Sequence, residues 1–376
     1  MATAPLNPPF RPDHVGSFLR TPELLAAREE RKAGKIDAAQ LKAVEDEAIR
    51  KLVAFEEGVG LRSITDGEYR REAWTAGFLA DGLGGLRPGD PSTAVSFFRD
   101  EKGVAHVATA FEVYARLKWR QPINVAPFEF LRGLTKQTPK VTIPSPTYVH
   151  LRSGRANISR EVYPDLDLFW EDIVDAYRKE LQALGAAGCN YVQMDDTTLC
   201  ALNDPAGAER ARRRGDDPLK LMFETYPEIM NRAYAGRPKG MLLAMHLCRG
   251  NSRSQWSSEG GYDMFAEMLF NKIDVDAYFM EYDTPRAGSF EPLRFLPKNK
   301  TVVLGIVSTK FQEIETKDQL KRRIEEASRY ADISQLSIGP QCGFASVSAG
   351  NQITWAHQEA KLRVLVETAR EVWGER

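Results

Sequence analysis

The chain lacks the features that mark several classes of protein. None of its apolar runs, over 376 residues, reaches the roughly 18 residues that a membrane span needs. Lysine and arginine number 51 and aspartate and glutamate 52, so no basic excess favours nucleic acid or anionic lipid. There is also no internal repeat and no low-complexity stretch. We therefore expect neither a membrane nor a nucleic acid as a partner.

Cysteine is scarce as well. The four cysteines, Cys189, Cys200, Cys248 and Cys342, do not make a disulfide scaffold in a chain of this length. The proline-rich N-terminal segment has no apolar core of the kind found in secretory signals. We therefore expect a reducing, cytoplasmic setting, where a cysteine packs in the core, binds a metal or acts as a nucleophile. For Cys189 we predict a packing role, whereas Cys200, which follows the fourth β-rich run, either packs in the core or lies near the functional site.

Short β-rich runs alternate with helical patterns along the whole chain. Hydrophobic residues make up 43% and charged residues 27%, an ordinary globular composition. The eight β-rich runs are 12–18, 61–67, 140–146, 190–196, 240–248, 275–283, 301–308 and 333–340. Most are apolar on both faces, which is typical of parallel strands covered by helices. Eight such units in order predict a (β/α)8 TIM barrel, as a single α/β domain over residues 1–376.

The helical patterns lie between these runs, with one interruption. Amphipathic helices are predicted over 166–188, 219–236, 314–330 and 352–373. Residues 84–138, between the second and third predicted strands, are turn-rich and too long for a simple crossover. We predict an insertion there. It serves either as a lid over the barrel mouth or as a contact in a homo-oligomer, and the sequence leaves both open.

Potential metal ligands gather at the predicted strand ends, where barrel enzymes carry out their chemistry. His246 and Cys248 are two residues apart at the end of the fifth strand, so both side chains point to one face. Glu281 ends the sixth strand, and Cys342 follows the eighth. One imidazole nitrogen, two sulfurs and one carboxylate oxygen form a tetrahedral set that suits Zn²⁺. Because an incoming thiol can displace the carboxylate, we predict a catalytic zinc site.

Motifs at these strand ends resemble the catalytic barrel of the cobalamin-independent methionine synthase family. The matching pieces are HVGSF (14–18), DGE (66–68), VQMDD (192–196), AMHLC (244–248), FMEYDTPRAG (279–288) and PQCGF (340–344). They cover nearly the whole chain in a specific order. The large synthases of this family carry a second, N-terminal barrel, so the chain resembles the short, single-barrel branch.

The resemblance implies a zinc-dependent S-methyltransferase that converts homocysteine to methionine, similar to 5-methyltetrahydropteroyltriglutamate–homocysteine S-methyltransferase. Its implied zinc ligands are the four residues described above. It assigns Gly16 and Ser17 to the carboxylate of the amino acid, and Glu68 and Asp195 to its amino group. A free thiol, with a pKa of about 8.5, is a weak nucleophile at neutral pH, and zinc would hold it as the reactive thiolate.

Two positions depart from the folate-using members of the family. Arg152 stands where those members stack a tryptophan on the pterin, and Val307 stands where they place a proton-donating histidine. A tertiary amine leaves poorly without protonation, so we expect methyltetrahydrofolate to be a slow methyl donor. The sequence leaves folate, methylcobalamin and other donors open. His150 and Tyr148 are nearby groups that could replace the missing acid.

Two other functions remain open. A zinc-dependent thiol alkyltransferase of the epoxyalkane–coenzyme M type would open an epoxide and would need no amino acid pocket. A non-catalytic zinc barrel would bind a corrinoid or a partner protein, and it would not need Glu68 and Asp195 beside the metal. The amino acid assignment weakens if these two acids merely pair with Arg70 or Arg71.

Overall fold

The computed structural model describes residues 8–90, 97–100, 103–107 and 110–374. Its main sheet has six parallel strands that lie side by side in chain order. They are β7 (Val141–Pro144), β8 (Tyr191–Asp196), β9 (Leu242–Leu247), β10 (Ala277–Glu281), β11 (Thr301–Val307) and β12 (Leu336–Pro340). All six fall within predicted runs, so these six strands are confirmed. Nearly every residue in them is buried, as expected for parallel strands covered on both faces.

The first two predicted strands are less regular. The two-residue strand β1 (Ser63–Ile64) pairs in parallel with β6 (Thr138–Pro139), directly before β7. The run 12–18 contributes a single parallel bridge, from Pro12 to Ile338 of β12. The prediction of a continuous strand over 12–18 is therefore wrong. Gly16 has a φ of 132°, a left-handed backbone conformation that interrupts the extended run.

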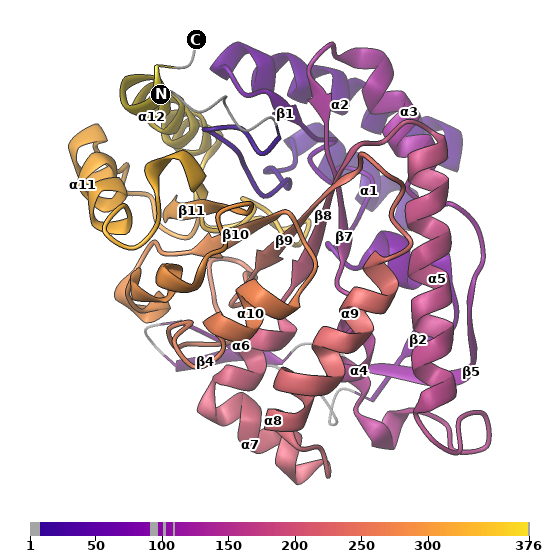
Figure 1. Ribbon diagram of the computed structural model, residues 1–376. Helices are drawn as coiled ribbons and strands as arrows, with labels where there is room; N and C mark the ends of the chain where they lie inside the picture. Colours follow the sequence, from indigo (N-terminus) through magenta and orange to yellow (C-terminus); the bar gives the residue numbers. More distant parts are fainter. Residues whose placement is uncertain (1–7, 91–96, 101–102, 108–109, 375–376) are drawn as a thin grey trace.

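Helices surround the strands (Figure 1). The predicted helices 166–188, 314–330 and 352–373 are confirmed as α5 (Asp167–Ala186), α11 (Lys317–Ala327) and α12 (Trp355–Trp373). The segment predicted as one helix over 219–236 is divided into α8 (Pro218–Lys220), a π-helical turn (Leu221–Thr225) and α9 (Tyr226–Tyr234). The other helices are α1 (Pro22–Lys32), α2 (Ala38–Val59), α3 (Val125–Leu134), α4 (Tyr148–Ser153), α6 (Thr198–Asn203), α7 (Pro205–Arg213) and α10 (Ala266–Lys272). Within the described residues, no helix is both long and apolar enough to cross a membrane.

The segment predicted as an insertion contains two antiparallel strand pairs. Strand β2 (Leu83–Pro88) pairs with β5 (Phe111–Trp119), and β3 (Phe97–Asp100) pairs with β4 (Gly103–Val107). Residues 91–96, 101–102 and 108–109 lie outside the described residues. The role of this segment, as a lid or as an oligomer contact, stays a prediction.

Candidate functional site

A cavity of about 550 Å³ lies at the carboxyl ends of the parallel strands. Open α/β folds bind their ligands at this edge, because the loops that follow the strands form a crevice there. Six of the eight predicted site residues line the cavity: Ser17, Glu68, Asp195, His246, Cys248 and Cys342. Gly16 and Glu281 are the two predicted residues outside this lining. The structure therefore brings together residues from both ends of the chain.

The three nitrogen and sulfur ligands form a compact group. The candidate ligand atoms of His246, Cys248 and Cys342 all lie within 4.8 Å of one another, and all three residues are buried. The two sulfur atoms are 3.5 Å apart, and both cysteines are free. Tetrahedral zinc with Zn–S bonds of about 2.3 Å would hold two sulfurs about 3.8 Å apart. The sulfur pair therefore needs only a small adjustment to bind the metal.

The histidine is oriented by a backbone carbonyl. His246 Nδ1 lies 3.3 Å from the carbonyl oxygen of Phe279 on the neighbouring strand β10. Its Nε2 is buried and has no hydrogen-bond partner among the described residues. Metal-binding histidines commonly donate one ring N–H to a carbonyl, which leaves the other nitrogen for the metal. His246 fits this arrangement through Nε2.

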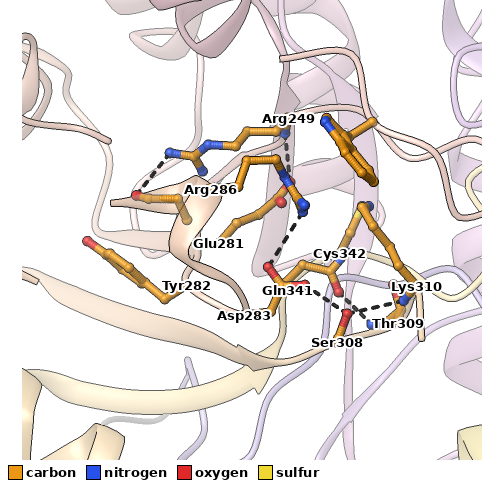
Figure 2. A network of polar contacts seen from close by, with 12 residues as sticks. Arg249, Glu281, Tyr282, Asp283, Arg286, Ser308, Thr309, Lys310, Gln341 and Cys342 are labelled. Carbon is orange, nitrogen blue, oxygen red and sulfur yellow. Dashed lines mark hydrogen bonds and ion pairs between the residues drawn. The ribbon is translucent and has the colours of Figure 1, made fainter. Parts of the chain in front are cut away.

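Glu281, the fourth predicted ligand, is the last residue of β10 and is fully buried. It falls outside the 4.8 Å group formed by the other three. Its Oε1 accepts a 2.6 Å hydrogen bond from the backbone N–H of Arg249, while Oε2 is buried without a partner among the described residues (Figure 2). Burial raises the pKa of Glu281, and the Lys310 ammonium opposes that rise. The nitrogen and two sulfurs of His246, Cys248 and Cys342 thus fit zinc, while Glu281 lies outside their group with Oε2 buried and without a partner among the described residues.

Glu68 has one oxygen held by the protein and one without a partner. Its Oε1 accepts a 3.0 Å hydrogen bond from the Thr142 hydroxyl, and Oε2 is buried with no partner among the described residues. Arg71 lies 3.9 Å from Oε1, while Arg70 pairs instead with Glu45 and Asp46. Glu68 is therefore only loosely paired with an arginine, and Oε2 remains for another group.

Asp195 is held in a similar way. Gln193, two residues earlier on β8, donates a 2.7 Å hydrogen bond from Nε2 to Asp195 Oδ1. Asp195 lies directly opposite His246 in the pairing of β8 with β9. Burial raises the pKa of Asp195 to about 7, although His246 opposes the rise. The two acids that were predicted to bind an amino group therefore lie on the cavity wall together with the candidate metal ligands His246, Cys248 and Cys342.

Gly16 and Ser17 are packed tightly against neighbouring strand ends. A Cβ atom on Gly16 would lie 2.8 Å from Thr142 Cγ2, and φ at this position is already positive. A Cβ atom on Gly343 would lie 1.9 Å from the Ser17 hydroxyl. The glycine after Cys342 therefore allows Ser17 to approach the cavity, which explains the glycine in the PQCGF motif.

The other wall of the cavity is aromatic. It includes Trp74, Phe98, Phe111 and Tyr148, together with Arg152. The ring centroids of Trp74 and Tyr148 are 4.6 Å apart, and the Arg152 guanidinium lies 6.0 Å from the Tyr148 ring centre. Arg152 thus lines the cavity. Tyr148 shares α4 with Arg152, whereas the other three rings come from other segments. The sequence had assigned no role to Trp74, in the loop after β1.

The two groups considered as replacement acids lie in different places. Tyr148 lines the cavity, whereas His150 is fully buried and bonded through Nδ1 to the Tyr226 hydroxyl at 3.0 Å. Burial, together with the charges of Arg214 and Arg155, lowers the pKa of His150 to about 3. His150 is therefore a neutral packing residue outside the cavity lining.

Lys310 is a charged residue near the ligands to which the sequence had assigned no role. It follows β11, is buried, and donates a 3.2 Å hydrogen bond from Nζ to the carbonyl oxygen of Gly250. Val307 was expected where the folate-using members have a proton-donating histidine. It is completely buried at the end of β11 and is not among the described cavity-lining residues. The sequence feature that could have identified Lys310 as a site residue is its position just after the predicted strand 301–308.

The remaining two cysteines lie apart from the ligand group. Cys189 is buried before β8, and its thiol is 3.5 Å from the Tyr191 carbonyl oxygen. Cys200 is buried in α6, and burial raises its pKa to about 12. Both positions suit a packing role.

Comparisons with a family model, with related sequences and with solved structures point to one family. Residues 11–371 match the family model described as the catalytic domain of cobalamin-independent synthase. The uncharacterized protein YxjH of Bacillus subtilis is 38% identical, over 97% of this chain and 95% of its own length. The methionine synthase of Pyrococcus abyssi is 26% identical, over 88% of this chain and 84% of its own. The structure of a candidate vitamin B12-independent methionine synthase from Listeria monocytogenes has a TM-score of 0.76 at 32% identity, and the match covers 98% of this chain and 99% of that one.

Proposed function

The chain belongs to the cobalamin-independent methionine synthase family, and on that premise we propose that it methylates the sulfur of homocysteine to give methionine. The observation that carries the proposal is the convergence of His246, Cys248 and Cys342 in one cavity with two acids. A thiol acceptor with an amino group matches this combination of soft ligands and carboxylates. The acceptor's sulfur would lie at the ligand group and its amino group at Glu68 and Asp195.

The metal that these residues suit is zinc, held by His246 Nε2, the two cysteine sulfurs and Glu281 Oε2. Zinc bound there would supply a Lewis acid that lowers the pKa of the acceptor thiol, so that it reacts as a thiolate near neutral pH. Neither His246 Nε2 nor Glu281 Oε2 has a partner among the described residues, which supports this assignment because buried polar atoms normally have partners.

The protein's own groups would orient the acceptor. Glu68 Oε2 and Asp195 Oδ2 would accept hydrogen bonds from the ammonium group of the acceptor. The other oxygen of each carboxylate accepts a hydrogen bond from Thr142 or Gln193. The segment of Gly16 and Ser17 would hold the acceptor carboxylate. In the transfer, a new carbon–sulfur bond forms as the bond from the methyl group to the donor breaks, and its electron pair leaves with the donor.

The methyl donor would enter along the aromatic wall. Trp74, Tyr148 and Arg152 line the cavity and would form the part that the acceptor leaves open. We propose that methyltetrahydrofolate is used slowly, since His246 is the only histidine among the described residues of this lining that could protonate a leaving nitrogen.

We further propose a single domain in which the strands close as a (β/α)8 barrel. Three contacts support closure. The bridge from Pro12 to Ile338 lies at one edge of the main sheet, and the pairing of β1 with β6 lies at the other. Between these two segments, Phe18 donates a 3.2 Å backbone hydrogen bond to Gly67. The four free cysteines accord with a reducing, cytoplasmic setting.

The decisive experiment is a matrix of thiols and methyl donors. Homocysteine and coenzyme M are each incubated with zinc-loaded and chelator-treated protein and with several donors in parallel, including triglutamyl methyltetrahydrofolate and methylcobalamin. We expect methionine to form from homocysteine only with the zinc-loaded protein. Efficient alkylation of coenzyme M by an epoxide, without any use of homocysteine, would instead support the thiol alkyltransferase function.

A further inference from the structure

The hydroxyl group of Tyr262 joins the ends of two neighbouring strands. It accepts hydrogen bonds from Arg249 Nη1 at 2.6 Å and from the backbone N–H of Glu281 at 2.9 Å. It donates to the Glu281 carbonyl oxygen at 3.3 Å. One donor and two acceptor positions are all that a phenol has, so this hydroxyl is fully used. Tyr262 is completely buried.

Arg249 completes the connection, because it directly follows Cys248. Its backbone N–H donates to Glu281 Oε1 at 2.6 Å (Figure 2). Its buried guanidinium lies 4.2 Å from the centre of the Tyr262 ring and donates two hydrogen bonds to the Gly260 carbonyl oxygen, at 3.1 and 2.6 Å. The two residues therefore tie the segment that carries Cys248 to both the backbone and the carboxylate of Glu281.

We propose that Arg249 and Tyr262 are positioning residues that fix the Glu281 carboxylate beside Cys248, with Oε1 tethered and Oε2 directed to a metal. This inference rests on the zinc site of the proposed function. Residues behind the ligands of a metal site typically change its affinity about 10- to 100-fold when they are altered. Because Oε1 is tethered to the backbone N–H of Arg249, the carboxylate would stay in place whether or not Oε2 binds a metal.

The chain offers a matched control for this role. Tyr278, on β10, is also completely buried, and its hydroxyl also has three polar contacts, with Leu269, Ile273 and Lys300. None of these three residues lines the cavity or belongs to the ligand group. Tyr262→Phe and Tyr278→Phe therefore remove the same atom from similar surroundings, but only the first removes contacts to Glu281.

The test measures zinc affinity by chelator competition, starting from the metal-free full-length protein. We expect Tyr262→Phe to weaken zinc binding about 10- to 100-fold and Tyr278→Phe to change it less than about twofold. The absorption spectrum of the Co²⁺-loaded protein should change in the first variant only. Equal effects of the two substitutions, or no effect of Tyr262→Phe, would overturn the proposal. If Tyr262→Phe does not fold, Arg249→Lys is the second variant, since it keeps the charge but loses the planar fork.

A double-mutant cycle tests whether Tyr262 acts through Glu281. In a Glu281→Gln background, the amide retains an oxygen for the Arg249 N–H but loses the charged ligand oxygen. Tyr262→Phe should then weaken zinc binding by less than about a further twofold, whereas independent effects would simply add. A full additional loss would show that Tyr262 has only a general structural role.

These measurements also separate the inference from the proposed function. A protein that binds zinc with the expected Tyr262 effect, but does not methylate homocysteine, would refute the function and leave the inference standing. A parent protein that binds no zinc would overturn both.

Discussion

The sulfur atoms of Cys248 and Cys342 lie 3.5 Å apart, although 94 residues separate the two cysteines in the sequence. Cys248 follows β9 and Cys342 follows β12, so the pair exists only because both strands end at the same edge of the sheet. The hydrogen bond from Cys248 holds the pKa of Cys342 well below its usual range. One sulfur is thus already favoured as a thiolate, the form that binds a metal.

Substitution of either cysteine in this pair should remove the metal without unfolding the protein. We expect Cys248→Ser and Cys342→Ser to lose zinc and activity, because each removes a thiolate ligand from a site at the strand ends. Zinc content after dialysis and the far-UV circular dichroism spectrum are the measurements. Cys200→Ser is the matched control, since Cys200 is also buried but lies on α6 outside the ligand group. The Cys200→Ser protein should retain the zinc content of the parent. Full metal content in both ligand variants would contradict the zinc assignment.

Methyltetrahydrofolate should be a slow donor. Arg152 lines the cavity, and Val307 is buried at the end of β11, where it presents no acid to a leaving nitrogen. The measurement is steady-state turnover of homocysteine with the triglutamyl form of the donor. Turnover at about one per second or faster, as in typical enzymes, would show that another group supplies the proton.

The convergence of His246, Cys248 and Cys342 could be predicted from the sequence because it depends only on strand order. His246, Cys248, Glu281 and Cys342 each lie at or just beyond the end of a run that is apolar on both faces, and such runs were confirmed as parallel strands. Parallel strands bring their carboxyl ends to one edge. The positions of these residues could therefore be predicted without knowing the conformation of any loop.

The features that were missed depend on loops and on backbone geometry. Trp74, Arg249 and Lys310 reach the site from loops whose paths no periodicity encodes. The strand predicted over 12–18 was too long, because a positive φ at Gly16 interrupts an otherwise apolar run. The contact between Arg249 and Glu281 uses a backbone N–H, so no side-chain pattern could indicate it.

The buried histidine on α4 should make stability depend on pH. The pKa of His150 is lowered by burial to about 3, whereas in the unfolded chain it is about 6.5. Between these values the unfolded chain binds a proton that the folded chain does not, so the free energy of unfolding decreases as the pH falls. The contribution of this residue is about 1.4 kcal/mol per pH unit. In urea titrations between pH 6.5 and 4.5, His150→Gln should therefore lose stability less steeply than the parent. Equal slopes would show that His150 accepts a proton in the folded state.

The acidic residues on the cavity wall should determine which thiol is used. Glu68 and Asp195 each have one oxygen held by a protein donor, Thr142 Oγ1 at 3.0 Å and Gln193 Nε2 at 2.7 Å. The other oxygen of each is then available to an ammonium group. A hydrogen bond to a charged group contributes about 1.5–3 kcal/mol, which is about a tenfold to a hundredfold change in affinity.

Glu68→Gln and Asp195→Asn should therefore raise the KM for homocysteine by about tenfold to a hundredfold, while zinc content stays unchanged because neither residue is a ligand. Coenzyme M, which has no amino group, is the matched control thiol. It should be a poor acceptor for the parent protein, and its use should change little with either substitution.

Arg71, 3.9 Å from Glu68 Oε1, is the competing partner of this carboxylate, and Arg71→Gln separates the two interpretations. If Glu68 binds the amino group of homocysteine, the Arg71→Gln variant should still discriminate between the two thiols. If Glu68 only pairs with Arg71, Glu68→Gln and Arg71→Gln should both leave that discrimination unchanged. Equal use of homocysteine and coenzyme M by the parent, with both acid variants indifferent to the amino group, would instead favour the thiol alkyltransferase.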